Sequence, residues 1–274
     1  DLSAFLSPLI KQNKSIGFVP TMGALHQGHL SLLKNSLSEN DVTVMSIFVN
    51  PTQFNNAEDL DKYPRTLERD VQIMQDLSNN IIVYAPEVAD IYEGNTISES
   101  FNYDGLENQM EGKHRPGHFD GVGTIVKRLF EIVQPNKAYF GEKDFQQLQI
   151  VKKLVSKYNI PVDVIGCPIH REANGLAMSS RNERLSESAR EKAAIIYQIL
   201  NSAKEIFQTN SAEQTIKFVE NEFKKHPEFE LEYFEIADEA TLLPVSEKEF
   251  DKKYRGFIAI FIENIRLIDN ISLN

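Results

Sequence analysis

The feature that most constrains this chain is an alternation of short apolar segments with longer amphipathic ones between residues 16 and 165. In one of the longer segments, Leu67, Val71, Met74 and Leu77 follow the three- and four-residue spacing of a buried helix face. Strands that alternate with helices of this length predict a doubly wound parallel sheet, with ligands beyond the carboxyl ends of its strands. The predicted strands are Ile16–Val19, Val42–Val49, Ile81–Tyr84, Lys137–Phe140 and Val162–Ile165.

The pattern changes beyond about residue 186, where two long helical segments come first and strand-like segments follow. Helices are expected near residues 188–207 and 212–225, and strands at Leu231–Ile236 and Phe257–Ile262. A polar, glycine-bearing loop separates the two patterns. The sequence therefore predicts a Rossmann-like domain over residues 1–170, a hinge loop over 171–185 and a smaller C-terminal α+β domain over 186–274.

Composition excludes several classes of function. The net charge of −11 argues against a nucleic-acid binder that relies on neutralising phosphates, although a local basic pocket still suits a small anionic substrate. No apolar segment approaches the length of a membrane span. The single cysteine, Cys167, lies in an apolar run, so we expect a buried filler residue in a protein of the reducing cytoplasm.

The segment Pro20–His29 follows the first predicted strand and leads into a predicted helix. It contains the turn glycine Gly23 and a His-x-Gly-His sequence formed by His26 and His29. A helix that begins near Gly28 would direct unpaired backbone N–H groups at a phosphate, and the two imidazoles would add donors in either protonation state. Two alternatives stay open: ordinary turn and cap residues, or a zinc pair, for which no nearby Cys, Asp or Glu offers a third ligand.

Two further polar segments carry groups that suit a phosphate. Gly141–Asp144 follows the fourth predicted strand. There the ammonium of Lys143 would neutralise a polyphosphate, and Asp144 would bind ribose hydroxyls or a metal-bound water, although a solvated turn is an equal alternative. Met178–Arg181 offers two hydroxyls and, in Arg181, a guanidinium capable of bidentate contact with phosphate.

Asn50 and Gln53 follow the second predicted strand and would orient a carboxylate or a hydroxyl without adding charge. Arg115 with His118 would meet a second carboxylate or, alternatively, form a surface turn with Asp120. No aspartate-rich metal site and no serine–histidine nucleophile competes with the three phosphate-binding segments. Together they favour chemistry at the α-phosphate of a nucleotide, in which the protein positions reactants and stabilises charge.

The His-x-Gly-His segment resembles the signature of the nucleotidylyltransferase superfamily, which includes the class I aminoacyl-tRNA synthetases. From about residue 16 to residue 182 the chain resembles one family within it, the pantothenate synthetases or pantoate–β-alanine ligases. His170 departs from that family, in which a small aliphatic residue precedes Arg-Glu-Ala, and little matches beyond about residue 190. The resemblance rests on Pro20–His29, Asn50–Phe54, Tyr63–Arg65, Arg115–Gly121, Gly141–Asp144 with Gln147, and Met178–Asn182.

The resemblance implies an ATP-dependent condensation of pantoate with β-alanine through a pantoyl-adenylate, which gives pantothenate, AMP and pyrophosphate in coenzyme A biosynthesis. Mg²⁺ would bind through the ATP phosphates, with no metal site on the protein. The implied catalytic residues are His26, His29, Lys143 and Arg181. The implied residues for pantoate and β-alanine are Gln53, Gln147, Asn50, Arg115 and His118. The implied ATP contacts are Met22, Gly23, Ala24, Leu25, His26, Gln27, Gly28, His29, Gly141, Glu142, Lys143, Asp144, His170, Met178, Ser179, Ser180 and Arg181.

The resemblance further implies that the C-terminal domain acts as a lid, and that the protein is a homodimer formed through its N-terminal domain. One alternative is another nucleotidylyltransferase, which would use a phosphate-bearing substrate and no amine. A second is a catalytically silent nucleotide-binding module, against which the intact His29, Lys143 and Arg181 argue. An aminoacyl-tRNA synthetase is poorly supported, because the chain is short and acidic and lacks an evident tRNA-binding extension.

Overall fold

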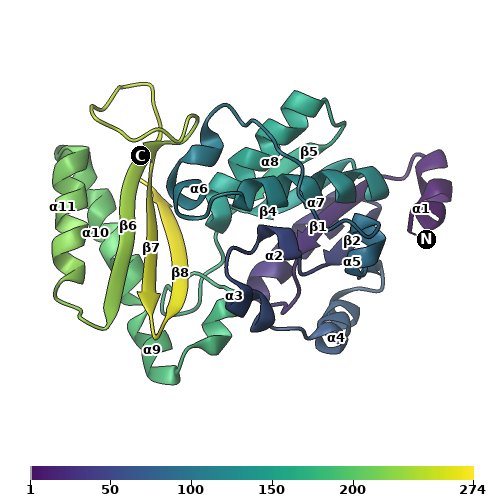
Figure 1. Ribbon diagram of the computed structural model, residues 1–274, viewed down its shortest axis with the longest axis horizontal. Helices are drawn as coiled ribbons and strands as arrows, with labels where there is room; N and C mark the ends of the chain where they lie inside the picture. The colour runs from purple at the N-terminus through teal and green to yellow at the C-terminus, as the bar shows by residue number, and fades with distance from the viewer. Residues whose placement is uncertain (1) are drawn as a thin grey trace. The chain divides into compact units, whose positions relative to one another are not determined.

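The computed structural model describes residues 2–274 and divides into two compact units (Figure 1). The second unit contains two short segments that lie far from the rest of it in the sequence. The predicted hinge at residues 171–185, and with it the division into three domains, stays a prediction. The first unit comprises Asp1–Glu107, Glu111–Glu142 and Gln147–Pro168, and the second comprises Asn108–Met110, Lys143–Gln146 and Ile169–Asn274.

The first unit is built on a five-stranded sheet in which every pairing is parallel, in the order β3-β2-β1-β4-β5. This confirms the predicted doubly wound sheet. The strand order reverses between β1 and β4, so the topological switch point lies between these two strands. The strands are β1 (Ile16–Thr21), β2 (Val42–Ile47), β3 (Ile81–Tyr84), β4 (Lys137–Gly141) and β5 (Asp163–Cys167).

Helices cover both faces of this sheet because successive strand residues point to opposite sides. Val19 and Met45 pack in one cluster with residues of α2 (Gln27–Glu39) and α4 (Leu67–Leu77). On the other face, the ring of Phe18 lies 6.2 Å from that of Phe130 in α7. Two further long helices are α7 (His118–Val133) and α8 (Phe145–Tyr158). Cys167 is buried, as predicted.

Other helical segments of the chain were not evident in its pattern. The stretch between residues 86 and 114 contains two short helices and a 3₁₀ turn. Within residues 2–274, no helix is long and apolar enough to cross a membrane. The additional segments are α1 (Leu2–Lys11), α3 (Ala57–Asp61), α5 (Val88–Tyr92) and α6 (Met110–His114), with the 3₁₀ turns η1 (Pro51–Gln53), η2 (Leu106–Asn108), η3 (Glu142–Asp144) and η4 (Ser180–Arg184).

The second unit is an α+β structure with a three-stranded antiparallel sheet in the order β6-β7-β8. The two predicted strands lie within β6 and β7, whereas β8 was missed. The first predicted helix is interrupted at Ala193 and Ala194 and forms α9 and α10. Helices α10 and α11 lie beside the sheet (Figure 1). The elements are α9 (Glu187–Lys192), α10 (Ile195–Thr209), α11 (Ala212–Phe223), β6 (Phe229–Asp238), β7 (Tyr254–Ile262) and β8 (Ile265–Ser272).

Candidate active site

A tight turn joins the end of β1 to the start of α2. Gly23 has φ +84° and Ala24 has φ +50°, so two successive residues adopt the left-handed conformation. A Cβ atom at Gly23 would lie 3.0 Å from Ile47 Cγ2 and 3.1 Å from Asp70 Oδ2, besides being strained at this φ. Glycine is therefore required here, and the turn places the start of α2 at the carboxyl edge of the sheet.

Asp70 in α4 holds this turn from inside the first unit. Its side chain is fully buried, and Oδ2 accepts the Ala24 N–H while Oδ1 accepts the Leu25 N–H, each at 2.9 Å. The hydroxyl of Thr66 also donates to Oδ1, at 3.2 Å. Sequence reasoning missed Asp70. The signal was present, because Asp70 stands three residues after Leu67, on the apolar face of the helix, where a charged residue needs a partner.

His26 and His29 cap α2 reciprocally. Nδ1 of His26 accepts the Gly28 N–H at 3.1 Å, and Nδ1 of His29 accepts the His26 N–H at 3.3 Å. The two rings lie with centroids 4.0 Å apart and planes 31° apart. A backbone N–H can only donate, so both Nδ1 atoms present a lone pair and a neutral ring carries its proton on Nε2. Both residues are thus helix caps, and each retains an N–H donor at Nε2.

The polar turn after β2 is organised by the buried side chain of Asn50. Its Nδ2 donates to Gln53 Oε1 and to the Gly121 carbonyl, each at 3.1 Å. Its Oδ1 accepts from the hydroxyls of Thr52 at 3.1 Å and Tyr92 at 2.5 Å. These four bonds use the full capacity of the amide. Asn50 therefore orients Gln53, while the predicted contact of Asn50 with substrate stays a prediction.

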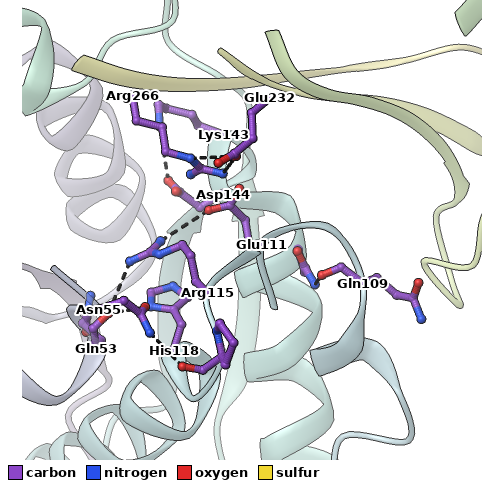
Figure 2. Close-up of polar contacts among 12 residues, drawn as sticks. Gln53, Asn55, Gln109, Glu111, Arg115, His118, Lys143, Asp144, Glu232 and Arg266 are labelled. Carbon is purple, nitrogen blue, oxygen red and sulfur yellow. Dashed lines mark hydrogen bonds and ion pairs between the residues drawn. The ribbon is translucent and has the colours of Figure 1, made fainter. Parts of the chain in front are cut away.

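Arg115 and His118 both donate hydrogen bonds to the backbone carbonyl of Gln53, and Figure 2 shows both side chains directed at it. The Gln53 carbonyl accepts from His118 Nδ1 at 2.8 Å and from Arg115 Nη2 at 3.3 Å. Nη1 of Arg115 also lies 3.3 Å from Glu111 Oε2. The surface-turn alternative is wrong for His118, which is buried. The glycine Gly121 is needed beneath this turn, since a Cβ there would lie 2.5 Å from the Thr52 carbonyl oxygen.

The turns after β1 and β2 contact each other directly, because Gln53 Nε2 donates to Met22 Sδ at 3.3 Å. Three motifs widely separated in the sequence thus meet within the first unit: the histidine turn, the Asn50–Gln53 turn and the Arg115–His118 segment. The ends of β1, β2 and β4 lie at one edge of a parallel sheet, as the sequence predicted for these motifs. Gly141 ends β4 beside the switch point, and Gln147 is half-buried on α8.

Lys143 and Asp144 belong to the second unit, where their segment is tied to the antiparallel sheet. Lys143 Nζ lies 3.8 Å from Asp144 Oδ2. The Lys143 carbonyl accepts from Asn270 Nδ2 at 2.8 Å, and the guanidinium of Arg255 stacks 4.0 Å from the Phe145 ring centroid. The backbone that carries the Lys143 ammonium is therefore fixed by β7 and β8, a dependence that the sequence did not show.

The loop with Ser179 and Arg181 is also well defined in the second unit. Ser179 caps η4 by accepting the Arg181 N–H at 3.3 Å. Below it, the Met178 N–H donates to the His170 carbonyl at 3.0 Å, while the His170 side chain is exposed. The backbone of His170 thus has a structural role that its unusual side chain does not disturb. Contacts of His170, Met178, Ser179, Ser180 and Arg181 with a nucleotide stay predictions.

Arg171 anchors the start of this loop to β8. Its guanidinium makes two hydrogen bonds to the buried Asp269, at 2.6 and 3.0 Å, and stacks 3.8 Å from the Tyr197 ring centroid. Asn182 closes the far end, where Nδ2 donates to Glu172 Oε1 at 2.9 Å and to the Ala177 carbonyl at 3.1 Å. The loop is therefore held at both ends by partners within its own unit.

The arrangement of the first unit is that of the α/β proteins that present a helix start and paired imidazoles at the edge of a parallel sheet. The sequence profile of one family, described as pantoate-beta-alanine ligase, matches residues 1–272. The chain belongs to this family of ligases.

In residues 2–274, no group of three or more His, Cys, Asp or Glu side chains is placed to hold a metal ion.

Individual relatives agree over nearly the whole chain. A pantothenate synthetase of Flavobacterium psychrophilum is 66% identical over 273 residues, which cover 100% of this chain and 97% of that protein. The solved pantothenate synthetase of Thermus thermophilus has a TM-score of 0.88 and 42% identity, covering 94% of this chain and 93% of that chain. A Francisella tularensis pantoate-β-alanine ligase, solved in complex with Beta-gamma ATP and β-alanine, has a TM-score of 0.80 and 38% identity, covering 99% and 94%.

Proposed function

We propose that this chain condenses pantoate with β-alanine at the expense of ATP, and releases pantothenate, AMP and pyrophosphate. The observation that carries the proposal is the reciprocal histidine cap at the start of α2, at the carboxyl edge of the sheet in a member of the ligase family. The Francisella tularensis relative, solved with Beta-gamma ATP and β-alanine, supports the binding of both compounds here.

In the first step, an oxygen of the pantoate carboxylate attacks the α-phosphorus of ATP. The bond from the α-phosphorus to the bridging oxygen breaks, and the electron pair leaves on pyrophosphate. The Nε2–H groups of His26 and His29, at the positive end of the α2 dipole, donate to the phosphates as charge develops. By resemblance to the family, the ammonium of Lys143 and the guanidinium of Arg181 would add positive charge to the ATP phosphates. Mg²⁺ held by the phosphates would offset further charge, as the resemblance to the family implies.

In the second step, the amine of β-alanine attacks the acyl carbon of the pantoyl-adenylate. The bond from this carbon to the AMP oxygen breaks, and the nitrogen loses a proton. Gln53 and Gln147 hold pantoate through neutral amides, with β-alanine beside Gln53. Asn50, Arg115 and His118 contribute by fixing the side chain and the carbonyl of Gln53, which is where their hydrogen bonds lie.

The wider setting belongs to the same proposal. A homodimer formed through the N-terminal domain and closure of the C-terminal domain over ATP rest on resemblance to the family. A cytoplasmic location rests on the single cysteine of the chain. Sedimentation of the purified chain would test the dimer, because a monomeric mass at micromolar concentration contradicts it.

One assay tests the reaction. AMP and pyrophosphate are measured after ATP is supplied with pantoate and β-alanine, singly and together. The proposal predicts sustained AMP formation only when both are present. Sustained turnover of a phosphate-bearing substrate with no amine would instead support another nucleotidylyltransferase, and ATP binding without pyrophosphate release would support a silent nucleotide-binding module.

A further inference from the structure

We propose that Asp70 is a positioning residue for the two histidines: it holds the peptide N–H groups of Ala24 and Leu25, and so sets how His26 and His29 face the phosphates. This rests on the proposed function, and it adds a residue that lies in none of the motifs of the active site. Asp70 does not touch reacting atoms, since its side chain is fully buried.

The geometry of the turn requires a carboxylate that accepts two backbone N–H groups at once. Two successive left-handed residues, Gly23 and Ala24, turn consecutive backbone N–H groups toward one point, and such an arrangement binds an anion. Here the anion comes from the protein, because the two oxygens of Asp70 each accept one of the two N–H groups at 2.9 Å. A left-handed conformation at a residue with a side chain persists only when its surroundings hold it.

The anchored peptides lead directly into the histidine cap. Leu25 is followed by His26, whose backbone N–H donates to Nδ1 of His29, while Nδ1 of His26 accepts from Gly28. A rotation of the peptide planes at Ala24 and Leu25 therefore changes the direction of the His26 N–H and loosens both bonds that fix the rings. The Nε2–H groups then lose their fixed orientation.

Replacement of the carboxylate by its amide isolates this effect. In Asp70→Asn the side chain keeps its volume, but one end becomes an NH₂ donor that faces a backbone N–H, so only one of the two peptides stays anchored. The matched control is Asp41→Asn. Asp41 likewise accepts a backbone N–H, that of Ser15 at 2.9 Å, but it lies at the amino edge of β2.

Two measurements test the proposal. In pyrophosphate–ATP exchange with pantoate, Asp70→Asn should lower kcat by roughly 100-fold, because a misplacement of catalytic groups by about 1 Å has an effect of this size. The KM for pantoate should stay within about twofold of wild type. Asp41→Asn should exchange at the wild-type rate. In ¹⁵N spectra of the histidine rings, the wild type should show unprotonated Nδ1 and protonated Nε2 for His26 and His29, and Asp70→Asn should show a mixture.

Failure of the proposed role of Asp70 can be told apart from failure of the proposed reaction. A folded Asp70→Asn protein with wild-type kcat and unchanged ring signals would overturn the proposal. If Asp70→Asn does not fold, Thr66→Val replaces it, because it retains the carboxylate and removes only the hydroxyl that orients Oδ1. It should lower kcat by roughly three- to tenfold, and an unchanged kcat would assign Asp70 a purely structural role. The ring spectra need no substrate, so they judge Asp70 even if exchange shows that the proposed reaction is wrong.

Discussion

The backbone N–H of His26 donates to Nδ1 of His29 across 3.3 Å. The side chain of the second histidine therefore holds the backbone of the first, which is the N-cap residue of α2. This bond decides between the two protonation states that the sequence left equally suitable. A protonated Nδ1 would face a backbone N–H and break the cap, so the capped form of each ring is the neutral one with its proton on Nε2. In the proposed reaction, the helix cap and the phosphate donor are therefore opposite ends of the same ring.

The two roles of His29 are separable by substitution. In His29→Asn the amide oxygen takes the place of Nδ1 and preserves the cap, but the donor at Nε2 is lost. Exchange should fall by on the order of 10²–10³, because one preorganised donor to the developing charge is removed, while thermal stability changes little. His29→Gln, whose amide nitrogen reaches the Nε2 position, should retain more activity than His29→Asn. Equal activity of His29→Asn and wild type would remove His29 from the mechanism.

Lys143→Ala and Arg181→Ala should affect chemistry more than folding. Each removes a charge that the proposed reaction assigns to the phosphates, so turnover should fall by on the order of 10²–10³ while the urea midpoint of unfolding stays near wild type. Lys192→Ala is the control in the same unit, since its ammonium is exposed and forms a surface pair with Glu228 at 3.5 Å, and it should turn over normally. Normal turnover with a lowered midpoint in the first two variants would reverse the assignment.

Gln53→Ala and Gln147→Ala should weaken the use of pantoate and leave ATP binding nearly intact, because neutral amides orient the acid and touch no phosphate. The KM for pantoate is measured in the exchange reaction, and ATP affinity by calorimetry with ATP alone. Asn50→Ala should resemble Gln53→Ala, since Asn50 Nδ2 donates to Gln53 Oε1. A large loss of ATP affinity in either glutamine variant would contradict their role.

Stability in acid should depend on Asp41. The backbone N–H of Ser15, and then the ammonium of Lys14 and the Ser15 hydroxyl, lower the pKa of Asp41 to about 2. In the unfolded chain this pKa is about 3.9, so the carboxylate stabilises the fold above about pH 4 and the stabilisation is lost as the pH falls toward 2. Urea unfolding of wild type and Asp41→Asn should therefore differ most at neutral pH and converge in acid. A difference independent of pH between 3 and 7 would argue against this.

Much of the fold was predictable because its signals are local. The strand Ile81–Tyr84 was predicted with its exact bounds, since a short apolar run lies between turn residues. The strand β8 was missed because Asp269 and Asn270 interrupt its apolar pattern. Both are buried and receive hydrogen bonds from Arg171 and Arg255, partners that no local pattern reveals. The helix break at Ala193 and Ala194 was missed because alanine is the strongest helix former, so the local sequence predicts a continuous helix there.

The candidate site likewise combines features that the local sequence predicts with features that it does not. Gly141, which ends β4, and the turn after β2 that contains Gln53 were predicted at one edge, because a parallel sheet brings all its carboxyl ends together. The support for these residues was not predictable, since it comes from distant segments. Asp70 reaches Ala24 across 46 positions in the sequence, and His118 reaches Gln53 across 65. Such contacts depend on tertiary packing, which propensity and spacing do not describe.

The central claim is that an acyl-adenylate forms before the amine reacts, and isotope exchange between pyrophosphate and ATP tests it most directly. Labelled pyrophosphate is incubated with the chain, ATP and Mg²⁺, with pantoate and β-alanine each present or absent. The account predicts label in ATP whenever pantoate is present, with no need for β-alanine. Exchange without pantoate, or exchange that requires β-alanine, would contradict the two-step reaction.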